Sequence, residues 1–435
     1  MNRLITLLVA LIALAANGYA KSPEKLIIEA IEKSDWLALD SLYKAAPEGS
    51  LSDFIDVYSR CLIGNRLNRP ELSIPAFEQL FGQHSEELSK IGTHALIFAM
   101  DLSRVGDNAK AAAMLSSVID NPALHLDSSE INQLKKALKR YESLSAYSPY
   151  SITFNDTVGC VPFKVVPAGN PKSKGVMMRI DDSEINGIKA NIVFDTGAGA
   201  NVISDSIAEK LNLIPIDAET KIGGFKPQVG SFAIAKELKI GNITVTDVPF
   251  FIMNITSHNA EADQYLKDLN IIIGSELMLQ LKEVTLDFVN SQITVPTVAP
   301  SRKGVAPNLC FSSSMNLLAR GSLHDTSLMM NVDTGDTSYG TLGKDFFRRH
   351  KKFVKGNGQT TALRRAGIGG TEISTGYLLP DITLSLGGNT VTLPHIEIQP
   401  KANPFGYECN LGLKSLMLFK KVRFNLVDFV LSTEE

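Results

Sequence analysis

The chain lacks the residue patterns of several common protein classes. Its 435 residues contain only four cysteines, too few over this length for a disulfide framework. Its seven histidines show no metal-ligand spacing, and no serine or cysteine nucleophile motif is present. The 43 basic and 46 acidic residues nearly cancel, so a net charge of −3 leaves no electrostatic footprint for nucleic acid. The sequence therefore predicts no metal, no other cofactor and no nucleic-acid partner, and buried apolar surface must hold the fold together.

Long apolar runs are absent after the first 20 residues. The N-terminus combines a basic residue at Arg3, an apolar core from Leu4 to Ala16, and small residues before Lys21. This order is typical of a secretory signal peptide, and its apolar core is too short to span a bilayer. We expect residues 1–20 to be removed, no transmembrane segment in the remaining chain, and a periplasmic or secreted protein.

The cysteines allow disulfides in an exported protein without requiring them. Cys310 and Cys409 fall in the same C-terminal region and are the best candidates for a bridge. Cys61 lies in a helical segment and Cys160 near a linker. Free buried thiols are the alternative for all four.

Helical periodicity dominates residues 21–146, which predicts an all-α domain. Gly106-Asp107-Asn108 followed by Ala111 resembles the second half of a tetratricopeptide-like helical hairpin, and Ala76 echoes Ala111 35 residues earlier. A packed helical domain of no repeat family is the alternative. Such a domain could bind a protein partner, place a substrate, or act as a removable prosegment.

Two Asp-Thr-Gly triplets are the most informative feature of the chain. Asp195-Thr196-Gly197 and Asp333-Thr334-Gly335 each end an apolar run that predicts a buried strand. A second glycine, Gly274 in one case and Gly412 in the other, follows each aspartate by 79 residues. Because equal spacing is hard to obtain otherwise, we infer an internal duplication.

Glycine pairs lie between these landmarks in both copies, Gly223-Gly224 in the first and Gly369-Gly370 in the second. A short helix and a further strand are expected after each late glycine. The sequence therefore predicts two related β lobes, at residues 147–300 and 301–435.

This order resembles the retropepsin-like and pepsin-like aspartic proteases, in which two lobes each supply one Asp-Thr-Gly loop. The resemblance covers residues 173–432. It implies a mainly β, pseudo-twofold acid protease fold, here preceded by the helical domain, with a peptide or protein as substrate. It also implies that Asp195 and Asp333 are the catalytic pair.

The resemblance assigns supporting roles to the neighbouring residues. Thr196 and Thr334 would hydrogen-bond backbone across the lobe interface, whereas simple turn capping is the alternative. Gly197 and Gly335 lack a Cβ, so the chain can turn sharply beside each carboxylate. The glycine pairs named above would form the tips of flaps that close over substrate, and ordinary hairpin turns are the alternative for them.

The chemistry explains why two carboxylates are needed. Two such groups held about 3 Å apart cannot both ionise, so they share one proton. One then acts as base toward a water molecule while the other donates a hydrogen bond to the scissile carbonyl. The sequence leaves open which of Asp195 and Asp333 holds the proton.

The second copy departs from the family pattern at two positions. Asp336 stands where the first copy has Ala198, and Asn410 stands where an apolar residue is expected. If Asp336 points toward the pair, its charge should raise the pKa values of the pair; if it points outward, it caps the turn.

Two function classes follow from these observations. The first is an exported aspartic endopeptidase, which retention of both aspartates favours. The second is a non-catalytic protein- or peptide-binding module built on the same fold, which Asp336 and Asn410 favour.

Overall fold

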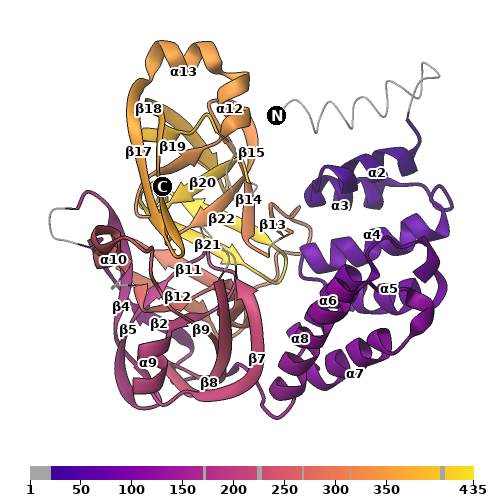
Figure 1. Ribbon diagram of the computed structural model, residues 1–435. Helices are drawn as coiled ribbons and strands as arrows, with labels where there is room; N and C mark the ends of the chain where they lie inside the picture. The colour runs from indigo at the N-terminus through magenta and orange to yellow at the C-terminus, as the bar shows by residue number, and fades with distance from the viewer. Residues whose placement is uncertain (1–20, 170–172, 223–227, 267–268, 314, 402–406) are drawn as a thin grey trace. The chain divides into compact units, whose positions relative to one another are not determined.

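The computed structural model describes the chain in two compact units (Figure 1). The described residues are 21–169, 173–222, 228–266, 269–313, 315–401 and 407–435. The helical unit extends to Glu142 and includes Cys310–Ser313, and the β unit comprises residues 143–309 and 314–435. An all-α segment followed by β lobes confirms the predicted fold class. The predicted signal peptide lies outside the described residues.

No helix in the described part of the chain is both long and apolar enough to cross a bilayer.

The helical unit is a series of consecutive packed helices. They are α2 (Pro23–Glu32), α3 (Trp36–Ala45), α4 (Asp53–Arg66), α5 (Pro70–Gln83), α6 (Ile91–Arg104), α7 (Asn108–Ile119) and α8 (Ser128–Leu144). Asp107 caps α7 by accepting a hydrogen bond from Lys110 N at 3.0 Å, as expected of an N-cap aspartate. Ala76 of α5 and Ala111 of α7 are both fully buried. The two echoing positions therefore face the core from the second helices of successive hairpins.

A buried carboxylate joins three of these helices. Asp101 of α6 accepts hydrogen bonds from Asn65 Nδ2 of α4 at 2.7 Å and from Ser73 Oγ of α5 at 2.6 Å. Arg104 Nη1 also donates to it at 3.0 Å. Burial raises the pKa of Asp101, and these donors oppose the rise.

The first lobe follows the helical unit along the chain. Its strands are β1 (Ser151–Phe154), β2 (Val158–Pro162), β3 (Lys164–Pro167), β4 (Val176–Ile185), β5 (Ile188–Phe194), β6 (Val202–Ser204), β7 (Ile214–Ile222), β8 (Gln228–Ile240), β9 (Ile243–Met253), β10 (Ile271–Ile273), β11 (Glu283–Asp287) and β12 (Gln292–Pro296). Three short helices interrupt them, α9 (Asp205–Lys210), α10 (Ala260–Leu266) and α11 (Ser275–Leu281).

The second lobe has a similar series of elements. Its strands are β13 (Leu309–Phe311), β14 (Leu317–Leu323), β15 (Thr326–Asp333), β16 (Gly340–Leu342), β17 (Gln359–Gly367), β18 (Gly370–Leu386), β19 (Asn389–Ile398), β20 (Cys409–Gly412), β21 (Lys421–Asn425) and β22 (Val430–Glu434). Its helices are α12 (Lys344–Arg349), α13 (Lys351–Asn357) and α14 (Leu413–Leu416).

The two lobes share one strand connectivity. In the first lobe the order β4-β5-β10-β6-β9-β8-β7 closes where β4 pairs with β8. In the second lobe the order β14-β15-β20-β16-β19-β18-β17 closes where β14 pairs with β18. Each aspartate-bearing strand, β5 or β15, runs parallel to the strand that ends at the late glycine. The connectivity therefore agrees with the internal duplication inferred from the sequence.

Two-residue turns in equivalent hairpins also recur. Asn186-Gly187 joins β4 to β5, and His324-Asp325 joins β14 to β15, with positive φ at all four residues. Positive φ at both turn residues matches the right-handed twist of the flanking strands, and Asn-Gly is the usual sequence for it.

A third sheet joins the lobes. Its order is β2-β12-β11-β21-β22, with β11 and β12 from the first lobe and β21 and β22 from the second. β11 pairs antiparallel with β21 over five residues, from Glu283 opposite Asn425 to Asp287 opposite Lys421. Figure 1 shows this sheet between the magenta first lobe and the orange second lobe. Continuous backbone pairing thus fixes one lobe against the other.

The suggested Cys310–Cys409 bridge is wrong. All four cysteines are free thiols, and both of these are buried. Cys310 lies in β13 and Cys409 in β20, and β14 and β15 separate these two strands in the order of the sheet. The alternative of free buried thiols holds for Cys61, Cys310 and Cys409, whereas Cys160 is free and half-buried.

Candidate active site

The two Asp-Thr-Gly loops meet between the lobes of the β unit. Asp195 follows β5, and its backbone N–H donates to Ile273 O at 2.9 Å. Asp333 is the last residue of β15 and lies in register with Gly412 of β20. Both aspartate residues are half-buried.

The threonines hold the loops together by four reciprocal hydrogen bonds. Thr196 N donates to Thr334 Oγ1 at 3.0 Å, and Thr334 N donates to Thr196 Oγ1 at 3.1 Å. Each hydroxyl then donates to backbone of the opposite lobe, Thr196 to Val332 O at 2.5 Å and Thr334 to Phe194 O at 2.6 Å. Both threonine side chains are almost fully buried, so these hydrogen bonds satisfy polar groups that water does not reach. The arrangement is the cross-lobe bonding that the resemblance implied.

The glycines allow the carboxylates to approach. Gly197 N donates to Asp195 Oδ1 at 2.9 Å, and Gly335 N donates to Asp333 Oδ1 at 2.9 Å. A Cβ on Gly197 would lie 2.5 Å from Asp333 Cγ, and a Cβ on Gly335 would lie 2.6 Å from Asp195 Cγ. No real Cβ tolerates such contacts, so each glycine makes room for the carboxylate of the other lobe.

The two carboxylates hydrogen-bond each other and titrate unequally. Burial raises the pKa of Asp195, while the amides of Gly197 and Ala198 and the bond to Asp333 oppose the rise. Burial also raises the pKa of Asp333. The negative charges of Asp195 and Asp336 raise it further, so the pKa of Asp333 lies well above its ordinary value. The pKa of Asp333 is therefore raised further than that of Asp195.

The Asp336 carboxylate caps its own turn with one oxygen and points toward the aspartate pair with the other. Its Oδ1 accepts from Ser338 N at 2.9 Å and from Ser338 Oγ at 2.7 Å, which caps the turn. Its Oδ2 accepts from Asn410 Nδ2 at 2.8 Å, and the same nitrogen donates to Asp333 Oδ2 at 3.0 Å. Asn410 thus bridges Asp336 to Asp333.

Further polar residues reach this site that motif reading did not single out. Asn331 Nδ2 donates to Asn410 Oδ1 at 2.7 Å. Burial raises the pKa of the Tyr407 phenol, and the charges of the nearby carboxylates raise it further. Asn316 Nδ2 donates to Gly197 O at 2.6 Å. Comparing the two copies position by position would have identified Asn331 and Tyr407, since the first copy has Val193 and Leu269 there.

The glycine-rich segments have different outcomes. Gly223 and Gly224 lie outside the described residues. In the second lobe Ile368 and Gly369 form the turn between β17 and β18, and Gly369 has a φ of 89°, which favours glycine. Gly369 N donates to Thr256 O of the first lobe at 2.8 Å. Ile368 packs against a buried first-lobe cluster that includes Phe251 and Ile272. The second hairpin therefore reaches across to the first lobe, while Gly370 begins strand β18.

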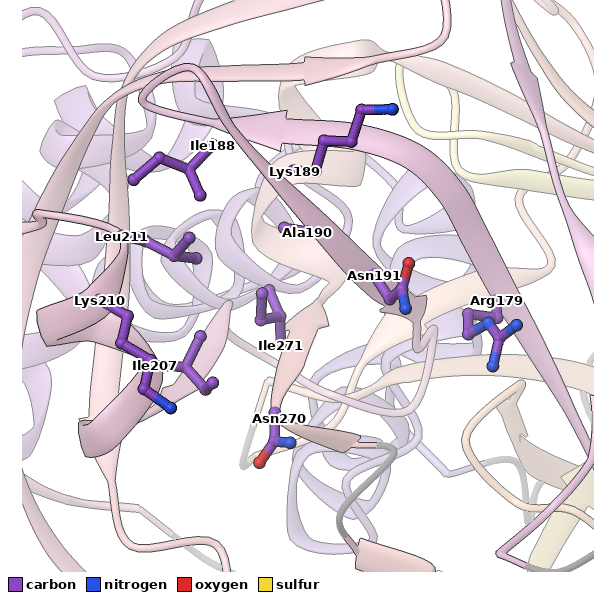
Figure 2. A pocket seen from close by; sticks show the side chains of 10 residues that line it. All are labelled: Arg179, Ile188, Lys189, Ala190, Asn191, Ile207, Lys210, Leu211, Asn270 and Ile271. Carbon is purple, nitrogen blue, oxygen red and sulfur yellow. The ribbon is translucent and has the colours of Figure 1, made fainter.

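A separate cavity of about 350 Å³ lies in the first lobe, away from the dyad. Figure 2 shows its lining, with Arg179, Lys189 and Lys210 around Ile188 and Ile271. It is formed by the first residues of β5 and β10, whereas Asp195 follows the last residue of β5. Its position gives it no part in the dyad's chemistry.

The side chains of the described residues form no group of three or more His, Cys, Asp or Glu placed to hold a metal ion.

A known protein family matches part of the first lobe. Residues 182–277 match a family model described as aspartyl protease. This stretch contains Asp195-Thr196-Gly197 and Gly274. The first lobe is thus similar to aspartyl proteases over these residues. The predicted resemblance to aspartic proteases is thereby confirmed, and the second aspartyl protease-like lobe rests on its matching connectivity and cross-lobe bonds.

A search of solved structures returned a retropepsin-like aspartic protease from Rickettsia conorii. It is 11% identical, with a TM-score of 0.22, and the match covers 34% of this chain and 92% of that one. No curated protein matches the chain.

Proposed function

We propose that the protein is an exported aspartic endopeptidase that hydrolyses peptide bonds with a water molecule activated between Asp195 and Asp333. The observation that carries the proposal is the reciprocal bonding of Thr196 and Thr334, which brings the two carboxylates of different lobes into hydrogen-bonding contact. Export rests on the signal-like residues 1–20.

In this mechanism the unequal pair divides the work. Ionised Asp195 takes a proton from the water, whose oxygen attacks the scissile carbonyl carbon. Protonated Asp333 donates to the carbonyl oxygen and stabilises the negative charge that develops there. The tetrahedral intermediate collapses when the proton held by Asp195 passes to the leaving nitrogen, which releases two peptides. No covalent adduct forms at any step.

Turnover tests the proposal directly. We expect the purified protein, produced from Lys21 onward, to cleave a denatured protein substrate at some pH between about 3 and 8, where one proton is shared by the pair. A statine-type inhibitor carries a hydroxyl group on a tetrahedral carbon and so mimics the tetrahedral intermediate. It should block this cleavage. Peptide binding without cleavage at every pH would instead support the non-catalytic binding module.

The pH profile of kcat/KM should respond in opposite directions to two substitutions beside the dyad. The alkaline limb reports loss of the proton from Asp333 in the free enzyme. Asp336→Asn removes a negative charge that raises the pKa of Asp333, so this limb should move to lower pH. Asn410→Leu removes a donor that lowers the pKa of Asp333, so the limb should move to higher pH.

The charged and titratable groups that face Asp333 are Asp195, Asp336 and Tyr407. Tyr407 stays neutral over this range because its pKa is raised, so Tyr407→Phe is the matched control that removes a hydroxyl and no charge. Shifts in the same direction for Asp336→Asn and Asn410→Leu would contradict the assignment of the proton to Asp333.

A further inference from the structure

The two lobes place equivalent positions around the two aspartates. In the first lobe Ile272 of β10 lies between Val193 and Val202, and Val202 pairs with Phe251. The second lobe repeats these strand pairs in the same order. The corresponding residues are Asn410 for Ile272, Asn331 for Val193, Thr341 for Val202 and Glu397 for Phe251.

Chemical character differs completely between the two groups. The lobe-1 set consists of apolar residues that pack in one cluster beside Asp195, namely Ala198, Val202, Phe251, Met253, Leu269 and Ile272. The lobe-2 set consists of their polar counterparts, namely Asp336, Thr341, Glu397, Gln399, Tyr407 and Asn410. A symmetric enzyme would offer the substrate the same surface on both sides of the cut bond. This chain offers an apolar surface on one side and a polar surface on the other.

Both sets adjoin the reacting atoms. The backbone N–H of Ala198 bonds the Asp195 carboxylate, and that of Asp336 donates to Asp333 Oδ1 at 3.0 Å. Asp336, Tyr407 and Asn410 are half-buried, so water or a ligand reaches them. In the lobe-1 set Ala198 and Leu269 are half-buried, and the other four residues form the buried core beneath them. A substrate whose cut bond lies over the dyad therefore meets the half-buried members of each set, apolar on one side and polar on the other.

The lobe-2 set carries an excess of negative charge. Asp336 and Glu397 lie close enough for the charge of Asp336 to act on Glu397. Arg365 acts on Glu397 and donates to Gln399 Oε1. The Asp336 carboxylate has no salt bridge to a described cation, and Asn410 links it to Asp333 of the dyad. The half-buried carboxylate of Asp336 thus makes this surface complementary to a cation.

We propose that the substrate residue on the lobe-2 set is lysine or arginine, and that the residue on the lobe-1 set is large and apolar. This inference rests on the proposed function, because it specifies the substrate of the same site. An ammonium or guanidinium group there adds charge-assisted hydrogen bonds to the Asp336 carboxylate, which already accepts from Ser338 and Asn410, whereas an apolar side chain removes water from this charge and gives it no cation in return.

Three matched peptides test the proposal on the wild-type enzyme. They share leucine on one side of the cut bond and carry lysine, glutamine or norleucine on the other, and each is made in both orders. For one order we expect kcat/KM for the lysine peptide to exceed that for norleucine by about tenfold or more, the range of one buried charged contact. Glutamine should fall between them. Equal rates for lysine and norleucine in both orders would overturn the proposal.

A double variant assigns the preference to the lobe-2 set. Asp336→Ala with Asn410→Ile copies Ala198 and Ile272 of the first lobe, so norleucine should then equal or exceed lysine. As a matched control, lysine in place of leucine on the lobe-1 side should lower kcat/KM in wild type and variant alike. A lysine preference that survives unchanged in the double variant would place the selectivity elsewhere and refute the inference.

Binding separates this inference from the proposed function. The Asp195→Asn variant keeps Asp333 and the whole lobe-2 set, and its affinity for the same peptides can be measured by calorimetry without turnover. Tighter binding of lysine than of norleucine supports the inference even if the wild type cleaves nothing. Cleavage by the wild type with no preference in rate or affinity leaves the proposed function standing and removes the inference.

Discussion

Replacing either aspartate of the dyad with asparagine should abolish peptide hydrolysis while the fold persists. Asparagine neither takes a proton from water nor carries the shared acidic proton, so kcat/KM should fall at least about a thousandfold for Asp195→Asn and for Asp333→Asn. The midpoint of thermal unfolding should stay constant or rise, because an amide removes the cost of burying a charge that the raised pKa values reveal.

Asp205→Asn is the matched control for these variants. Asp205 is exposed at the start of α9 in the same lobe as Asp195, and its carboxylate bonds only the adjacent Ser206 N among the contacts of its side chain given by the structure. Its kcat/KM should equal that of the wild type. Full activity in either dyad variant would rule out the proposed mechanism, whereas a lower unfolding midpoint would indicate a damaged fold.

Adding one methyl group at either dyad glycine should have the second largest effect. A Cβ at position 197 would meet Asp333 Cγ at 2.5 Å, and a Cβ at position 335 would meet Asp195 Cγ at 2.6 Å. Gly197→Ala and Gly335→Ala must therefore push the carboxylates apart. Because misplacement by about 1 Å costs on the order of a hundredfold in rate, we expect kcat/KM to fall by at least that factor. Overpacking should also lower the free energy of unfolding by about 1–3 kcal/mol.

Gly356→Ala provides the control for the added methyl group. Gly356 lies in α13 of the second lobe, and a Cβ there meets no atom within 4 Å. Alanine should leave kcat/KM unchanged and stabilise the protein by about 0.5–1 kcal/mol, the usual difference between the two residues in a helix. Wild-type activity in Gly197→Ala would show that the carboxylates need not lie as close as the structure places them.

The duplicated architecture was predictable because it is recorded in local patterns. Apolar runs before Asp195 and Asp333 and the equal distances to Gly274 and Gly412 reflect strands and turns whose side chains are fixed by burial and backbone geometry. Each such signal depends on a few neighbouring residues, so one chain displays it without an alignment.

The polar set of the second lobe was not predictable in the same way. In the sequence, Asp336 and Asn410 were visible only as departures from a pattern, and Glu397 carried no signal of its own. Strand β16 lies between the strands of Glu397 and Asn410, and its Thr341 is in register with both. The Cys310–Cys409 suggestion failed for a related reason, because two residues of the same lobe can lie on strands that are not neighbours, and β14 and β15 lie between β13 and β20 in the sheet. Such contacts depend on strand register, which is set by pairing between distant segments.

The sequence by itself determined the internal duplication, the two carboxylates and the helical segment before them, since each depends on periodicity, spacing or residue type within a short stretch of chain. Only the tertiary structure decided that the pKa of Asp333 is raised further than that of Asp195, that the second hairpin bonds Thr256, and that an apolar cluster of the first lobe includes Ala198. These properties depend on contacts between residues that are far apart in the sequence. Asn410 and Asp333, for example, are 77 residues apart, and they act on each other only because folding brings them within hydrogen-bonding distance.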